Sequence, residues 1–167
     1  VRNGRYSSIT GVSGLCVKTC FNTFVPLITK AGLFTMDKLY RVVIIDDDEF
    51  SADNLCLELK KYNRLSIDGM ARNGANGRKL LEKVHPDLLF LDVELPDMKG
   101  MELLEQLRGA ITWNMQIVFY TAYDKYMIYA IRGAAFDYLL KPIDKKELEG
   151  IIDCFMKKAE ESAAASL

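Results

Sequence analysis

The residues with the clearest capacity for chemistry each follow a short apolar run. Asp92 follows the run at 88–91, and three aspartates follow the run at 41–45. Two later runs end in Thr121 and Lys141. Short apolar runs of this kind are typical of strands buried on both faces of a parallel sheet, whose carboxyl ends meet at one edge. We therefore expect carboxylates, a hydroxyl and an ammonium around one point.

This combination of groups suits a divalent cation and a phosphoryl group. Neighbouring carboxylates raise one another's pKa unless a cation lies among them. Several hard oxygen ligands favour Mg²⁺ over zinc. A metal and a lysine beside a free carboxylate would bind a phosphoryl group, and aspartate can act as the nucleophile. Taken singly, each of these residues is an ordinary turn or surface residue, so the prediction that Asp92 is the nucleophile depends on their convergence.

Strand-like and helix-like segments alternate five times after residue 40. The strands are expected at 41–45, 66–71, 88–91, 116–121 and 135–140. The helices are expected at 50–62, around 80–84, and at 100–108, 125–132 and 145–161. Short connections and right-handed crossovers then give an α/β domain with a doubly wound, five-stranded parallel sheet and helices on both faces.

The amino-terminal segment differs in composition from the rest of the chain. Residues 1–35 carry four basic and no acidic side chains, which leaves 18 basic and 23 acidic side chains elsewhere. We expect 1–37 to be an extension outside the domain, 38–161 to be the domain, and 162–167 to be a tail or the start of a linker. No run approaches the length of a membrane span, and no basic stripe predicts direct nucleic-acid binding. Four scattered cysteines favour a reducing cytosol over a disulfide or zinc framework.

The motifs, in this order, resemble the receiver domain of two-component response regulators over roughly residues 38–161. They are Ile44-Ile45-Asp46-Asp47-Asp48-Glu49, Leu91-Asp92-Val93-Glu94-Leu95-Pro96 with Gly100, Tyr120-Thr121-Ala122, and Asp137-Tyr138-Leu139-Leu140-Lys141-Pro142. The resemblance implies the flavodoxin-like (CheY-like) fold with strand order 2-1-3-4-5.

The resemblance also implies a set of roles at the sheet edge. Asp92 would accept phosphate from a sensor histidine kinase. Asp48, Asp92 and the backbone carbonyl of Glu94 would bind Mg²⁺, and Asp47 would hold metal-bound water. The match to Glu49 and the following helix selects this pair of acids, so Asp46 falls at a position that is usually apolar in the family.

Readout residues are implied in the same way. Lys141 would contact the phosphoryl oxygens from a turn with a cis proline, and Thr121 would hydrogen-bond one of them. Thr121 and Tyr138 would form the switch pair. They would alter a homodimerisation face made by the fourth helix, the fifth strand and the fifth helix, which includes Tyr126, Tyr129, Arg132 and Lys145. Such a domain is a signalling phosphoprotein, with at most self-phosphorylation and autodephosphorylation, rather than an enzyme.

The segments 120–126 and 136–142 resemble receivers of the LytTR subgroup, in which a DNA-binding domain usually follows the receiver. Only a few residues follow the last predicted helix, so we expect either a fragment of a cytoplasmic transcriptional regulator or a stand-alone receiver. DNA would be contacted only through an output domain that the sequence does not contain.

Two other functions remain open at this point. The first is a Mg²⁺-dependent phosphohydrolase with an aspartate nucleophile, since Asp92-Val93-Glu94 loosely imitates an Asp-x-Asp pair. Such enzymes usually carry the pair on the first strand and need a cap over the substrate. The second is a receiver-like interaction module that is never phosphorylated, against which Asp92, Thr121 and Lys141 argue.

Overall fold

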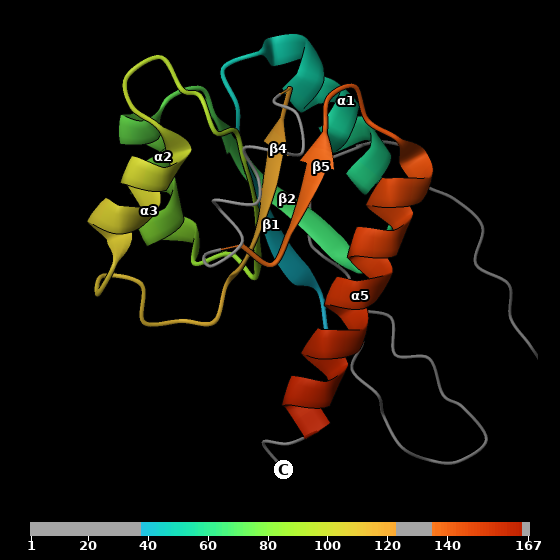
Figure 1. Cartoon of the computed structure of the whole chain (residues 1–167). Helices are drawn as coiled ribbons and strands as arrows, with labels where there is room; N and C mark the ends of the chain where they lie inside the picture. Colours follow the sequence, from blue (N-terminus) through green and yellow to red (C-terminus); the bar gives the residue numbers. More distant parts are fainter. Residues whose placement is uncertain (1–37, 123–134, 165–167) are drawn as a thin grey trace, which may run out of the picture. The chain divides into compact units, whose positions relative to one another are not determined.

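The computed structural model describes residues 38–122 and 135–164 (Figure 1). The chain divides into two units, Val1–Met36 and Asp37–Leu167, and the described residues belong to the second. The expected extension at 1–37 and the expected helix at 125–132 lie outside the described residues.

Five parallel strands form one sheet in the order β2-β1-β3-β4-β5, as predicted. The strands are β1 (Tyr40–Ile45), β2 (Leu65–Ala71), β3 (Leu88–Leu91), β4 (Gln116–Thr121) and β5 (Asp137–Leu140). β1 and β3 are adjacent in the middle of the sheet, with Ile45 opposite Leu91. The residues that follow these two strands are therefore neighbours at the carboxyl edge.

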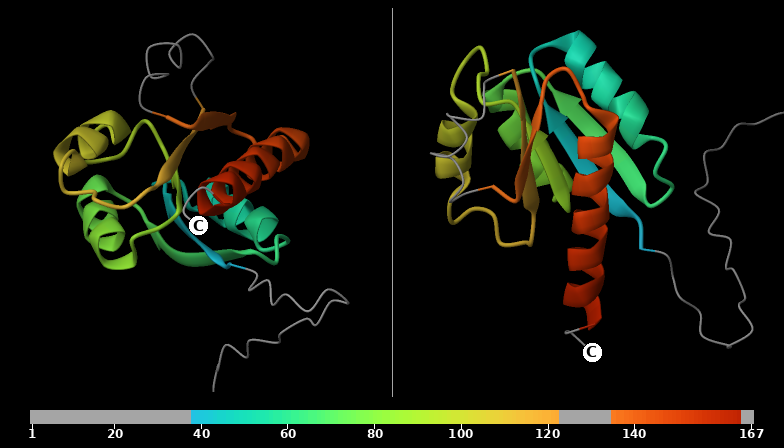
Figure 2. Two further views of the ribbon diagram at one scale, coloured as in Figure 1. Left: turned by 90° about the horizontal axis from the view of Figure 1, so that it is seen from below. Right: turned by 45° about the vertical axis from the view of Figure 1, so that its right-hand side comes forward.

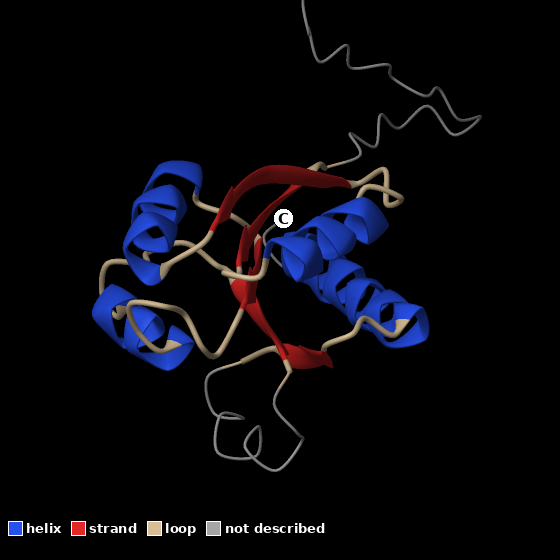
Figure 3. Cartoon of the chain, turned by 90° about the horizontal axis from the view of Figure 1, so that it is seen from above, coloured by secondary structure: helices blue, strands red, loops and turns tan. Residues whose placement is uncertain are grey.

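In the part of the chain that the structure describes, four helices flank the sheet, two on each face. They are α1 (Glu49–Leu59), α2 (Gly74–Val84), α3 (Gly100–Leu107) and α5 (Lys145–Ala164). α1 and α5 cover one face, and α2 and α3 cover the other (Figure 3). Side chains cap three helices at their amino ends: Asp48 accepts from Phe50, Asn73 from Asn76, and Asp144 from Lys146.

The sheet separates two hydrophobic cores, because successive side chains on a strand point to opposite faces. Val42 and Ile44 of β1 pack in the core under α1 and α5, which we call the α1–α5 core. Val43 and Ile45 pack in the core under α2 and α3, the α2–α3 core. All four are fully buried, which is why the strand reads as an uninterrupted apolar run.

Three helices differ from the predicted bounds. α1 ends at Leu59 rather than at 62, and α2 begins at Gly74 rather than around 80, because Asn73 caps it. α5 continues to Ala164 rather than ending near Glu161, and its last turns extend past the amino-terminal edge of the sheet (Figure 2). On α1, Leu57 is 60% exposed, although Leu55 and Leu59 on either side of it in the sequence are buried. The helical period points Ala52, Leu55 and Leu59 at the sheet, so Leu57 lies on the outer surface.

Candidate functional site

The sheet's own hydrogen bonds position the polar residues at its carboxyl edge. The amide of Asp46 donates to the carbonyl of Ala71 (3.0 Å), and that of Asp92 donates to the carbonyl of Ile45 (2.8 Å). The amide of Lys141 donates to the carbonyl of Thr121 (2.8 Å). Each residue thus continues the ladder of its strand by one bond, and rigid strands place all of them at the same edge.

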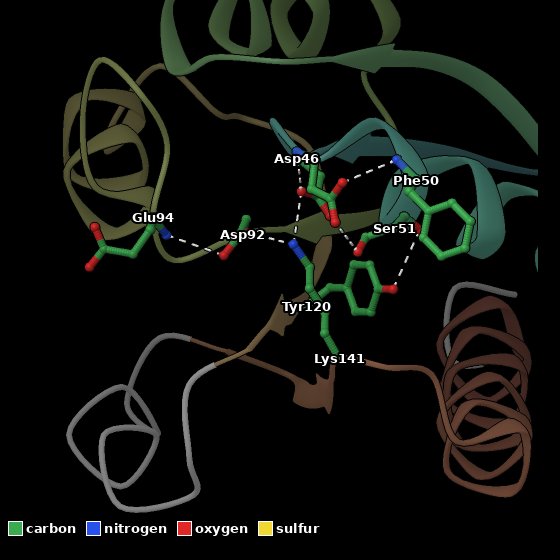
Figure 4. Close-up of polar contacts among 8 residues, drawn as sticks. Asp46, Phe50, Ser51, Asp92, Glu94, Tyr120 and Lys141 are labelled. Carbon is green, nitrogen blue, oxygen red and sulfur yellow. Dashed lines mark hydrogen bonds and ion pairs between the residues drawn. The ribbon is translucent and has the colours of Figure 1, made fainter.

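The ammonium of Lys141 joins two of these carboxylates. Its Nζ donates to Oδ1 of Asp46 (2.8 Å) and to Oδ2 of Asp92 (2.5 Å), as Figure 4 shows. The Lys141 side chain is only 11% exposed. Burial alone favours the neutral amine, but the hydrogen bonds and charges of Asp46 and Asp92 outweigh it and raise the pKa of Lys141. The lysine therefore keeps its positive charge beside Asp92.

Asp46 is the most deeply buried acid of the site. Its side chain has no exposed surface, and its Oδ2 has no hydrogen-bond partner among the described residues. Burial raises the pKa of Asp46, although the Lys141 ammonium opposes this effect. An unpartnered buried carboxylate oxygen costs free energy unless a cation or water reaches it.

Asp46, Asp47 and Asp92 form a cluster that could hold a metal ion. One carboxylate oxygen from each lies within 4.8 Å of the other two. Asp46 and Asp92 are buried and Asp47 is exposed, so the cluster is open on one side. Oxygen ligands with an open side suit a hard divalent cation that keeps some water. A cation bound in this cluster would also give the Oδ2 of Asp46 the partner that it lacks among the described residues.

The structure places Asp48 differently from the expectation. Asp48 is the amino-terminal cap of α1: its Oδ1 accepts from the amide of Phe50 (3.2 Å), and its Oδ2 accepts from the hydroxyl of Ser51 (2.5 Å). The Ser51 hydrogen bond lowers the pKa of Asp48. Both carboxylate oxygens of Asp48 thus accept hydrogen bonds from the first turn of α1. In the acidic cluster, Asp46 stands where the family resemblance had implied Asp48.

The loop after β3 holds the backbone of Asp92 closely. The amide of Glu94 donates to Oδ1 of Asp92 (3.2 Å), while the Glu94 side chain pairs with Lys99. A Cβ at Gly100 would overlap the carbonyl oxygen of Asp92, so the chain requires glycine there. Asp97 ties this loop to α2 by accepting from the amides of Gly74 (2.7 Å) and Ala75 (2.9 Å).

Thr121 and Tyr138 share one face of the sheet. Thr121 is fully buried, and it follows Phe119 by two residues on β4. Tyr138 pairs with Phe119 in the β4–β5 register and packs against the α2–α3 core. The Lys141–Pro142 peptide is cis, as the resemblance implied. Tyr126, Tyr129 and Arg132 lie outside the described residues.

Two features of the site escaped the sequence analysis. The Tyr120 ring lies beneath the Lys141 ammonium, with Nζ 5.0 Å from the ring centroid. A groove of about 560 Å³ also runs beside the site, between α1 and the loop after β5. Its apolar lining includes Phe50, Leu57 and Pro142. The available signal for the groove was Phe50, an apolar residue immediately after the acidic run.

Across the part of the chain that the structure describes, no helix combines the length and apolarity needed to cross a bilayer.

Residues 42–153 match the family model of the response regulator receiver domain. The transcriptional regulatory protein BtsR of Escherichia coli (strain K12) is 39% identical over 111 residues, which cover 66% of this chain and 46% of that protein. An uncharacterized response regulatory protein of Vibrio cholerae is 34% identical over 120 residues, 72% of this chain and 50% of that protein. The chain thus spans about half the length of these relatives.

Solved structures agree. The receiver (REC) domain of AraT, a response regulator from Geobacillus stearothermophilus, is 26% identical with a TM-score of 0.65, over 75% of this chain and 98% of that one. The response regulatory domain of mrkE from Klebsiella pneumoniae is 25% identical with a TM-score of 0.64, over 72% and 98%. With the acidic edge and its lysine, these matches show that the chain belongs to the receiver domain family of two-component response regulators.

Proposed function

We propose that this receiver accepts a phosphoryl group on Asp92 from a sensor histidine kinase and passes the signal to an output that controls transcription. The observation that carries the proposal is the buried Lys141 ammonium, which lies between Asp46 and Asp92 at hydrogen-bond distance. Within the family shown above, this arrangement presents one nucleophilic carboxylate next to a fixed positive charge.

Asp46, Asp47 and Asp92 would hold Mg²⁺, together with the backbone carbonyl of Glu94. The bound cation would neutralise charge on the transferring phosphoryl group. Asp92 would form its bond to phosphorus while the bond to the donor's imidazole nitrogen breaks, which leaves an acyl phosphate on Asp92. Lys141 would contact the phosphoryl oxygens, because its Nζ already lies beside Oδ2 of Asp92. The protein's main contribution is placement.

The output step would begin at Thr121 and Tyr138. Thr121, whose backbone carbonyl accepts from the amide of Lys141, would turn its hydroxyl toward a new dianion at Asp92. The space that the hydroxyl leaves would lie on the face where Tyr138 packs. The altered surface would include β5 and the start of α5, where Lys145 lies, and would form a homodimer.

The docking surface for the kinase would be the apolar groove beside the site. Phe50 is 75% exposed and Leu57 is 60% exposed, on the α1 side of the groove. Exposed apolar side chains beside a reaction centre are typical of a protein contact. The groove reaches Lys141, so a protein donor that covers it would bring its phosphohistidine to Asp92.

The nature of the output comes from the relatives. BtsR is described as a transcriptional regulatory protein, and this chain matches about half of it. We infer that the full protein is a cytoplasmic regulator of the LytTR type, with DNA contacted through a domain beyond this sequence.

Intact-mass analysis tests the proposal. The wild-type chain is incubated with acetyl phosphate and Mg²⁺, and we expect a gain of one phosphoryl group that Asp92→Asn abolishes and Asp53→Asn, an exposed α1 control, retains. Phosphorylation of Asp92→Asn would contradict the site. Steady release of phosphate from a phosphomonoester would favour the phosphohydrolase, and Mg²⁺ binding without phosphorylation would favour the interaction module.

A further inference from the structure

Tyr120 is a buried tyrosine to which the receiver mechanism described above gives no role. It is 2% exposed and lies on β4, immediately before Thr121. Its ring faces the ammonium of Lys141, and its hydroxyl donates to the carbonyl oxygen of Ser51 in the first turn of α1 (3.4 Å; Figure 4). One side chain therefore contacts both the reactive lysine and α1.

The contact has a definite electrostatic sense. A lysine ammonium has three N–H groups, and Asp46 and Asp92 accept from two directions. Tyr120 presents the negative face of its ring on another side, at a distance at which cation–π attraction acts. The ring stabilises the cation without offering a lone pair that would compete with the carboxylates. It therefore favours the orientation in which the ammonium faces Asp92.

The Lys141 side chain has an alternative orientation available, toward the groove beside the site. Tyr120 and Lys141 both line the groove between α1 and the loop after β5, which opens to solvent. A flexible four-carbon side chain at the edge of this space could turn its ammonium toward water. The Tyr120 ring opposes that movement, and its packing in the α1–α5 core holds the ring in position.

We propose that Tyr120 is a positioning residue, whose ring holds the Lys141 ammonium against Asp92 for phosphoryl transfer. The inference rests on the proposed function, since it assigns Tyr120 a part in that reaction. It concerns the aromatic face rather than the hydroxyl. Withdrawing electron density from the ring while its shape is retained should therefore weaken the attraction between the ring and the Lys141 ammonium, and should slow phosphorylation of Asp92.

The test is a graded series at position 120. Tyr120→Phe keeps the aromatic face, and phenylalanines with one, two or three ring fluorines at this position weaken that face stepwise at nearly constant shape. We expect the initial rate of phosphorylation by acetyl phosphate to stay within about threefold of wild type for Tyr120→Phe. It should then fall with each fluorine, to about tenfold lower for the trifluoro ring. A flat series would overturn the proposal.

A second background separates positioning from packing. In Lys141→Ala, the same fluorine series should leave the residual rate unchanged, because the group that the ring positions is gone. An equal decline in both backgrounds would mean that the ring acts only through packing, and would overturn the proposal. The matched control is trifluorophenylalanine in place of Tyr40, which packs in the same α1–α5 core and should leave the rate unchanged.

A spectroscopic readout keeps this inference distinct from the proposed function. The ¹⁵N signal of the Lys141 ammonium is assigned by its loss in Lys141→Ala. Its hydrogen exchange with water should become faster with each fluorine. If the wild-type chain takes no phosphate on Asp92, the proposed function fails while this measurement still reports on the contact. If Asp92 is phosphorylated and neither rate nor exchange follows the fluorine series, only the role of Tyr120 fails.

Discussion

The backbone of Gly100 approaches the carbonyl oxygen of Asp92 so closely that no Cβ fits between them. The first residue of α3 thereby sets the position of the proposed phosphoacceptor. The amide of Gly100 also donates to the carbonyl of Val93 (2.8 Å), which closes the loop around Asp92.

Gly100→Ala should therefore displace Asp92. We expect phosphorylation by acetyl phosphate to fall about tenfold, because small displacements of a reacting group are costly. Overpacking should also lower the free energy of unfolding by about 1–3 kcal/mol. Gly150→Ala on α5 is the control, since a Cβ there meets no atom within 4 Å. It should raise the free energy of unfolding by about 0.5–1 kcal/mol. Equal behaviour of the two variants would contradict the prediction.

Asp46→Asn and Asp48→Asn form a matched pair that tests the composition of the acidic cluster. Asparagine caps a helix as well as aspartate does, so Asp48→Asn should leave both α1 and Mg²⁺ affinity nearly intact. Asp46→Asn removes a buried carboxylate from the cluster and should weaken Mg²⁺ binding at least about tenfold. Calorimetric titration measures both. A larger loss in Asp48→Asn would restore the assignment made from the sequence.

Lys141→Met leaves Asp46 and Asp92 buried without their cation. Removing one partner of a buried ion pair is strongly destabilising, so the free energy of unfolding in EDTA should fall by about 3 kcal/mol. Mg²⁺ should restore part of this loss, because an ion that binds only the folded chain stabilises it. Denaturant unfolding with and without Mg²⁺ checks both effects. The control is Lys157→Met, an exposed α5 position, which should change neither.

We expect Asp97, which lies outside the acidic cluster, to make the stability of the fold depend on pH. The amides of Gly74 and Ala75 hold the pKa of Asp97 below its usual value of 3.8. Its contribution to stability is therefore complete above about pH 5 and is lost as the pH falls through the lowered pKa. The difference in Tm between wild type and Asp97→Ala should be constant from pH 7 to pH 5 and shrink below about pH 4. A difference that grows on acidification would contradict the assignment.

Phe50→Ser with Leu57→Ser tests the groove. Both side chains are exposed, so the fold should be unaffected. Phosphotransfer from a purified histidine kinase that phosphorylates the wild-type chain should fall about tenfold. The rate with acetyl phosphate should be unchanged. Met70→Ser, an exposed apolar position on β2, should change neither rate. A parallel loss with both donors would place these residues in the chemistry rather than in docking.

The strand order and the meeting of Asp92 with Lys141 were predictable, because alternating strands and helices with short connections allow few topologies. The choice among Asp46, Asp47 and Asp48 was not. Three consecutive acids carry no periodicity, and what decides between them is one backbone bond, from the Asp46 amide to the Ala71 carbonyl, which extends β1 by a residue.

The contact between Tyr120 and Lys141 could not be predicted from the sequence for a different reason. Strand alternation implies that Tyr120 and Thr121 point to opposite faces of the sheet. It does not say how far the Lys141 side chain reaches, since that depends on the flexible stem and on the two carboxylates that receive it. Contacts made by long side chains follow from the assembled site and not from residue spacing.

The two cores on either side of the sheet have a consequence for information flow. Tyr120 belongs to the α1–α5 core, and Thr121 lies on the side of Phe119 and the α2–α3 core. If Asp92 is phosphorylated as proposed, two adjacent residues of β4 beside it face opposite halves of the domain. We therefore expect substitutions at Tyr120 to act on phosphoryl transfer, beside α1, and substitutions at Thr121 to act on the readout toward Tyr138.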